Sequence, residues 1–201
     1  MANVEHLDFS EKPRTLARRR QVLEAAARCF RLHGFHACSM AQISTESSMS
    51  VGHIYRYFTG KEAIIAAIVR EDVDRFLCKM AEFPMDAPDI RAAMVERAEE
   101  GITKAIDIEQ LALMLEIRAE AARNPAIAEL VREADAHIAE PLRRIIAAAV
   151  GRPLAKADLD ARVEMFHLIF QGFALRTAIN PALDRRALAQ IVKSSIAAIL
   201  T

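Results

Sequence analysis

The chain has 201 residues, of which 53% are hydrophobic, and its 27 basic and 27 acidic residues give a formal net charge of zero. This composition excludes intrinsic disorder, and only six glycines and seven prolines exclude a collagenous or low-complexity chain. No apolar run is long enough to span a bilayer and the first residues lack a signal-peptide layout, so we expect a cytoplasmic protein with no membrane partner.

The sequence predicts an all-α chain of about nine helices, because Ala, Leu, Glu, Arg and Ile dominate and alternating strand patterns are absent. After an N-terminal arm (residues 1–14), a helix is expected over 15–33 and stops at Gly34. Two short helices follow over 40–47 and 51–57, each preceded by a capping serine, Ser39 and Ser50. Together they predict an N-terminal domain over residues 15–60.

Residues 61–201 predict a second helical domain. Its helices are expected from residue 61 into the low 80s, from about Pro88, over 107–122, from Pro125 towards Gly151 with a kink at Pro141, over 158–179 and over 184–200.

The charge is distributed unevenly along the chain. Residues 12–61 contain nine basic and two acidic residues, a net charge of +7, whereas residues 1–11 carry −3 and residues 62–201 carry −4. A basic segment favours a nucleic-acid partner, because phosphate attraction and counterion release supply most sequence-independent affinity. The alternative is an ordinary solvated basic helix face.

A helix followed by two short helices joined by a tight turn is the arrangement of a helix-turn-helix. The first helix of such a pair crosses the phosphate backbone and the second enters the major groove. Ile54 and Phe58 are four residues apart, so they share a face that can anchor the second helix to the core. Gly52 would let the backbone approach DNA closely. The outward-facing candidates are Val51, His53, Tyr55, Arg56 and Tyr57.

These residues resemble the DNA-binding domain of the tetracycline-repressor (TetR) family of transcriptional regulators over about 45 residues. The resemblance rests on Val22-Leu23, Ala25-Ala26, Phe30 and Gly34, on Ser50-x-Gly52-x-Ile54-Tyr55-x-x-Phe58, and on Lys61-Glu62. It implies that Ser39, Tyr57 and Lys61 contact phosphates and that the second short helix reads bases in a palindromic operator. The predicted DNA-binding residues are Ser39, Ser50, Val51, Gly52, His53, Tyr55, Arg56, Tyr57 and Lys61. Packing is the alternative role for the two tyrosines.

One position departs from the family pattern. The turn between the short helices usually contains Ala-Gly, but this chain has Ser47-Ser48. Serine adopts the left-handed conformation less readily than glycine, so the sequence predicts a strained or altered turn.

The resemblance further implies a homodimer formed by the last two helices. The predicted interface residues are apolar positions on those helices: Val163, Phe166, Phe170, Leu188, Ile191 and Ile196. The alternative is that these helices form the core of a monomer.

An effector pocket is expected among the middle helices, because methionine and phenylalanine side chains suit a hydrophobic ligand. The predicted lining is Phe76, Met80, Met94, Arg97, Met114, Arg118, His137, Phe166, Phe170 and Phe173, with Glu116 and His167 as further polar candidates. The alternatives are core packing for the apolar residues and helix-surface ion pairs between Arg118 and Glu116 or Glu120.

The sequence thus predicts a DNA-binding repressor that a small, largely hydrophobic effector releases, with no cofactor or metal. An enzyme is disfavoured because no phosphate-binding loop, zinc motif or nucleophile elbow is present. A second alternative is a thiol-based redox sensor at Cys38, which lies next to a helix N-terminus. Cys29 and Cys78 are expected to fill core space, and three widely spaced cysteines predict no disulfide framework.

Overall fold

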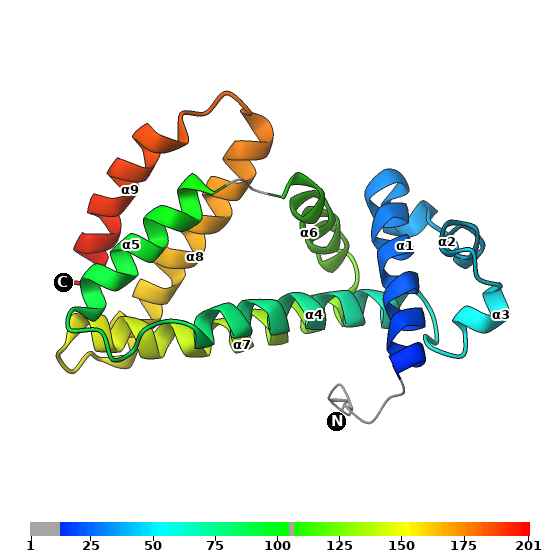
Figure 1. The fold of residues 1–201 in the computed structure, drawn as a ribbon, viewed down its shortest axis with the longest axis horizontal. Coiled ribbons are helices and arrows are strands. Elements are labelled where there is room, and N and C mark those ends of the chain that lie inside the picture. The colour runs from blue at the N-terminus through cyan, green and yellow to red at the C-terminus, as the bar shows by residue number, and fades with distance from the viewer. Residues whose placement is uncertain (1–12, 105–106) are drawn as a thin grey trace.

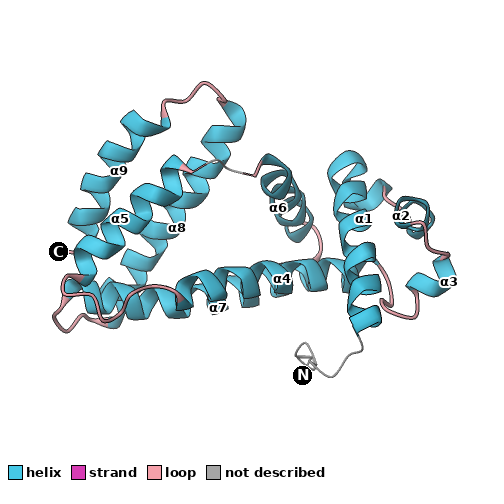
Figure 2. Ribbon diagram, in the orientation of Figure 1, coloured by secondary structure: helices cyan, strands magenta, loops and turns pink. Residues whose placement is uncertain are grey.

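The computed structural model describes residues 13–104 and 107–201, so residues 1–12 of the predicted N-terminal arm lie outside the described residues. The described chain contains nine α-helices and no strands (Figures 1 and 2), which confirms the predicted all-α class. The helices are α1 (Pro13–Ala37), α2 (Met40–Ser47), α3 (Val51–Ile54), α4 (Lys61–Ala81), α5 (Ile90–Thr103), α6 (Ile108–Ala121), α7 (Pro125–Val150), α8 (Lys156–Ile179) and α9 (Arg185–Ile199).

Most helix boundaries follow from capping residues that are visible in the sequence. The Ser39 side chain accepts a hydrogen bond from the Gln42 amide in a capping box, and Ser50 accepts one from the His53 amide, which confirms both predicted caps. Asn124 caps α7, and Pro125 occupies its first turn as expected. α7 then passes through Pro141 as one continuous helix.

Two helices differ in length from their predictions. Gly34 has a φ of +76°, so the chain bends there as expected, but helical structure resumes and α1 ends only at Ala37. α3 ends at Ile54 instead of reaching residue 57, because the following residues form tighter turns. The Tyr57 amide, for example, donates to the Ile54 carbonyl, three residues earlier.

The molecule is elongated, with α1–α3 at one end and α5, α8 and α9 at the other (Figure 1). α4 and α7 run side by side between the two ends, and α6 stands next to α1. One hydrophobic core joins α1–α3 to the first half of α4, to α6 and to the start of α7. A second core lies among α5, α7, α8 and α9. No helix in the described part of the chain is long and apolar enough to cross a membrane.

The turn between α2 and α3 has an unusual backbone conformation. Ser48 has a φ of +53° and is the one non-glycine residue with positive φ in the described chain. The Ser48 and Met49 amides donate to the Thr45 and Ser44 carbonyls and so close the end of α2. The predicted strain therefore falls on Ser48, because a Cβ is unfavourable in the left-handed region.

Replacing Ser48 with glycine is expected to raise the free energy of unfolding by about 0.5–1 kcal/mol. Glycine removes the Cβ penalty but gains freedom in the unfolded chain, so the net gain is small. Urea denaturation at a fixed protein concentration measures the change. Ser48→Val should instead lower stability, and a glycine variant no more stable than the parent would contradict the assignment of strain to this residue.

Candidate DNA-binding surface and effector cavity

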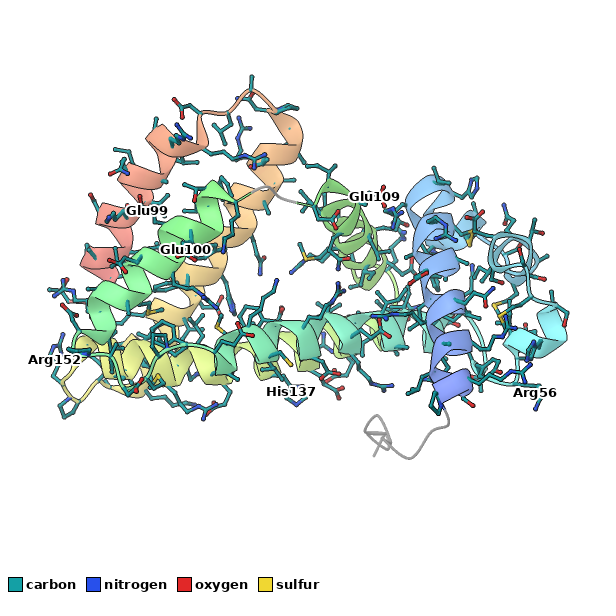
Figure 3. The ribbon with its side chains drawn as sticks, viewed as in Figure 1. Arg56, Glu99, Glu100, Glu109, His137 and Arg152 are labelled. Atoms are coloured by element: carbon teal, nitrogen blue, oxygen red, sulfur yellow. A yellow bond between two sulfur atoms is a disulfide. The ribbon has the colours of Figure 1, made fainter. Side chains whose placement is uncertain are left out.

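The surface around α3 forms the outer tip of the N-terminal domain, where Arg56 projects from the molecule (Figure 3). Ile54 and Phe58 are buried, which confirms their predicted role as anchors. Tyr55 and Arg56 are exposed, and neither makes a side-chain hydrogen bond or ion pair within the described chain. The anchored face and the free face of this segment are therefore opposite, as a helix that enters a DNA groove requires.

Some of the predicted DNA-binding side chains already have partners within the protein. The Tyr57 hydroxyl lies 3.3 Å from His53 Nε2, so these two side chains position each other. The Lys61 ammonium donates to the Phe35 carbonyl at 2.6 Å and to that of His36 at 3.3 Å. Because an ammonium has three donors, Lys61 closes the end of α1 and keeps one donor for another acceptor.

The segment that follows α3 is held from α1. The Arg19 guanidinium donates to the Tyr57 carbonyl at 3.2 Å and lies over the Phe58 ring, 4.7 Å from its centroid. Gln21 donates to the Ser47 carbonyl at 2.6 Å, on the turn between α2 and α3. α1 thus fixes both ends of α3, a role for which the basic run at 18–20 gave no signal beyond charge.

The cysteines differ from the expectation drawn from their spacing. Cys29 and Cys38 form a disulfide with a Cα–Cα distance of 5.9 Å, and Cys78 is exposed, not part of the core. The bend at Gly34 explains the pairing, since it returns the chain so that Cys38 meets the side of α1. Cys38 has no solvent exposure, whereas an oxidant-sensing thiolate needs access. The redox-sensor alternative is therefore not supported.

Carboxylates on one face of α6 bind the end of α1. Glu116 accepts a hydrogen bond from the Phe35 amide at 2.8 Å. Glu120 has only 1% of its side chain exposed and lies 3.0 Å from His36 Nε2 and 3.1 Å from Arg123. Glu109, at the other end of α6, pairs with Arg31 at 2.8 Å. The predicted surface pairs between Arg118 and these glutamates do not form; the glutamates connect the two domains instead.

A cavity of about 560 Å³ lies among α4, α5, α6, α7 and α8. Seven of the ten predicted pocket residues line it: Phe76, Met80, Met94, Arg97, Arg118, Phe166 and Phe170. The other three do not. His137 is exposed and points away from the body of the molecule (Figure 3), Phe173 packs against Ile102 and Ala189, and Met114 lies elsewhere on α6.

Several lining residues were missed from the sequence. Phe83 follows α4, and Gln171 lies one residue beyond Phe170 on α8. Asp135, Ile138, Leu142 and Ile145 recur at intervals of three and four on α7, which places them on one face. That spacing is a signal that could have identified the α7 wall of the cavity.

The polar residues of the cavity fall into paired and unpaired groups. Arg97 lies 3.9 Å from Glu82, and Lys104 lies 3.3 Å from Glu100. In contrast, the side chains of Arg118, Asp135, His167 and Gln171 have no hydrogen-bond or ion-pair partner within the described chain. Nε2 of His167 is fully buried as well as unpaired. A buried polar atom without a partner is costly, so the cavity is prepared for polar contacts with a ligand.

An ion pair and a hydrogen bond join helices that surround the cavity. Lys193 of α9 donates to Glu99 of α5 at 2.8 Å, and this hydrogen bond lowers the pKa of Glu99 and raises the pKa of Lys193. Gln110 of α6 donates to Asp72 of α4 at 2.6 Å. Burial raises the pKa of Asp72 despite the opposing effects of Arg75 and Gln110, so this carboxylate has lost hydration to join α4 to α6.

An apolar stripe runs along the outer face of α8. Leu168 is 64% exposed, and Ile191 on the neighbouring α9 is 68% exposed. The stripe follows the spacing of three and four that keeps side chains on one helix face. Its members on α8 are Met165, Leu168, Gly172, Leu175 and Ile179.

This stripe changes the predicted dimer interface. Val163, Phe166 and Ile196 are buried in the chain's own second core, so they cannot meet a partner and their assignment is corrected. Phe170 and Leu188 are half-buried against the same helices. Ile191 is the one exposed residue among the six that were predicted.

Comparison with known protein families gives two matches. A family model described as bacterial regulatory proteins, tetR family, matches residues 22–68. A second, described as BetI-type transcriptional repressor, C-terminal, matches residues 91–201. Among curated proteins, the HTH-type transcriptional regulator UidR of Escherichia coli strain K12 is 35% identical over 122 residues, which are 61% of this chain and 61% of UidR. The matched part therefore spans less than two thirds of that relative.

Solved structures extend the similarity to nearly the whole chain. GusR of Salmonella enterica has 30% sequence identity and a TM-score of 0.78, with 96% of this chain and 99% of that chain covered. FadR of Bacillus subtilis in complex with stearoyl-CoA has 20% identity and a TM-score of 0.71, with 90% of this chain and 97% of that chain covered. At that identity the FadR similarity establishes a shared fold.

Proposed function

The chain belongs to the TetR family of bacterial regulatory proteins, and on that premise we propose that it is a homodimeric repressor released from a palindromic operator by a small organic effector. The observation that carries this proposal is the position of α6, which contacts the N-terminal domain on one face and contributes Arg118 to the cavity on another. The relatives that share this fold are transcriptional regulators, which favours regulation over catalysis.

The N-terminal domain supplies the DNA contacts in this proposal. The segment 51–57 presents His53, Tyr55 and Arg56, while Ile54 and Phe58 hold it to the core. The positive charge of residues 12–61 would attract the DNA phosphates, whereas the negative charge of residues 62–201 would be repelled by them.

α6 supplies the coupling between the two domains. Successive residues of a helix are about 100° apart, so Arg118 points roughly 160–200° away from Glu116 and Glu120. An effector that draws Arg118 into the cavity would therefore move the carboxylates that hold Phe35 and His36 at the end of α1. Release follows if the effector binds the displaced arrangement more tightly than the DNA-bound one.

The apolar stripe of α8, together with Ile191, supplies the dimer contact. A contiguous exposed apolar face on two adjacent helices is typical of an interface, and two-fold pairing would present two copies of α3 to successive major grooves. The half-site spacing of the operator then reflects the distance between the two copies of α3.

The test of this function begins with selection of DNA from a random pool by the wild-type protein, which should yield a palindrome. His53→Ala is expected to change the base preferred at one position of each half-site, at a cost of about 1–3 kcal/mol there. Arg56→Ala should weaken binding to all sequences and reduce the salt-dependence slope by about one, because Arg56 is exposed and has no ion-pair partner in the described chain.

Fluorescence anisotropy with the selected site and with scrambled DNA distinguishes the two effects. Arg132→Gln, on the exposed side of α7, serves as the charge-matched control and should leave both affinities unchanged. Selection of no consistent sequence, or equal effects of His53→Ala on selected and scrambled DNA, would refute the proposed recognition surface.

A further inference from the structure

The chemistry of the cavity narrows the class of effector, an inference that rests on the proposed function. One part of the cavity is apolar: Met94, Leu142, Ile145 and Phe166 belong to the second hydrophobic core. The rings of Phe166 and Phe170 are stacked, with centroids 6.3 Å apart. Flat aromatic surfaces of this kind favour a bulky, preferably aromatic, ligand body.

The cavity also contains polar groups without partners in the described chain: Arg118, Asp135, His167 and Gln171. Asp135 is the first of the α7 wall residues, so it lies about 15 Å along the helix from Ile145, at the end nearer α6. Arg118 enters from α6 itself, and His167 lies on α8 next to Phe166. The cavity thus combines an apolar lining with polar groups, of which Arg118 and Asp135 lie at the end nearer α6.

The charge of the lining favours an anion. Its cationic residues are Lys79, Arg97, Lys104 and Arg118, against the acidic residues Glu82, Glu100 and Asp135. Two ion pairs occupy four of these residues, which leaves Lys79, on the exposed rim, and Arg118 against Asp135. The remaining charge is +1, the complement of a single negative charge.

Arg118 is the group best suited to bind the negative charge of a ligand. Arg118 is half-buried and its guanidinium has no counterion in the described chain, so no ion pair joins it to Asp135. A planar guanidinium binds a carboxylate or sulfonate through two parallel hydrogen bonds, and exclusion of water strengthens them. His167 can donate to the same anion from its buried Nε2 in the tautomer that is protonated there.

We propose that the effector is an organic monoanion with a bulky apolar body, whose anionic group is bound by Arg118 and His167 and whose body lies against Phe166 and Phe170. Asp135, at the end nearer α6, disfavours a second negative charge on the ligand. The cavity volume of about 560 Å³ suits a molecule of drug-like size.

Two fluorescent probes that differ by one charged group provide the test. 1-Anilinonaphthalene-8-sulfonate carries an aromatic body and one sulfonate, and N-phenyl-1-naphthylamine has the same body without the sulfonate. Arg118→Gln is expected to weaken binding of the sulfonate about tenfold or more and to change binding of the uncharged probe less than twofold. Arg118→Lys should restore part of the loss, because it restores the charge without the planar fork.

Arg132→Gln is the matched control and should leave the affinities of both probes unchanged, since this exposed residue of α7 lies outside the cavity. Circular dichroism of each variant establishes that it is folded, and Arg118→Lys gives the comparison if Arg118→Gln is not. Equal loss of both probes in Arg118→Gln, no loss of either, or the lack of saturable sulfonate binding to the wild type would overturn the proposal.

Binding of the selected operator, measured on the same preparations, separates this inference from the function on which it rests. Intact operator binding with no discrimination between the probes would refute the anion class alone. Failure of the wild-type protein to bind any DNA sequence selectively would refute the repressor function, whereas the probe comparison would still decide the chemistry of the cavity.

Discussion

Leu168→Glu is expected to convert the protein from a dimer to a monomer and to weaken operator binding by at least about 100-fold. The substitution places a negative charge on the apolar stripe of each copy of α8, so the proposed contact between the two stripes would bring like charges together. A monomer binds one half-site and loses the effective concentration that links the second contact to the first, a gain of about 10²–10⁴ in affinity. Light scattering after size-exclusion chromatography gives the mass, and anisotropy with the selected operator gives the affinity.

Met85→Glu is the control for adding charge at an exposed apolar residue. Met85 is 47% exposed and lies between α4 and α5, away from the stripe. The Met85→Glu substitution should leave the dimer and the operator affinity unchanged. A dimeric Leu168→Glu variant, or a wild-type protein that is monomeric at micromolar concentration, would contradict the proposed interface.

Ile54→Ala is expected to lower the free energy of unfolding by about 3 kcal/mol and to abolish selective DNA binding. Ile54 has no solvent exposure and lies in the first hydrophobic core, so truncation removes buried contacts and leaves a cavity. α3 has only four residues and depends on this anchor for its position. Urea denaturation at fixed protein concentration measures the stability, and anisotropy measures DNA binding.

Val51→Ala is the matched control on the same helix. Val51 faces outward and is half-exposed, so its truncation should cost less than about 1 kcal/mol of stability while it alters base preference. If Val51→Ala proved as destabilising as Ile54→Ala, α3 would face the core with the opposite side, and the proposed recognition surface would be wrong.

The helix starts and anchor residues of the N-terminal domain could be predicted from the sequence because local features define them, whereas the disulfide between Cys29 and Cys38 could not. Ser39 and Ser50 cap their helices through side chains that contact residues three positions away, and Ile54 and Phe58 anchor by simple helical spacing. The departure at Ser47-Ser48 predicted a strained or altered turn, and the structure places a positive φ at Ser48. Such interactions join residues only a few positions apart, so they can be recognised from the sequence alone.

The C-terminal domain could be predicted as helices but not as surfaces. Val163 and Ile196 are as apolar as Leu168 and Ile191, yet the first two are buried in the chain and the last two are exposed. The sequence shows that a residue is apolar, but it does not show which neighbouring helix packs over that residue. His137 was misplaced for the same reason, because its side of α7 follows from how the helix is oriented against α4.

The shared core between the two domains has a consequence for hybrid regulators built by exchanging parts between relatives. The predicted boundary at residue 60 is convenient in the sequence, but Ile64, Ile65 and Ile68 of α4, Ile117 of α6 and Ile127 of α7 pack in the same core as α1–α3. A crossover at residue 60 would therefore combine core residues from two different proteins, whose side chains do not pack well against each other. Functional hybrids should arise when the contact residues of α4, α6 and α7 travel with the N-terminal segment, so that the transferable module is a set of non-contiguous segments.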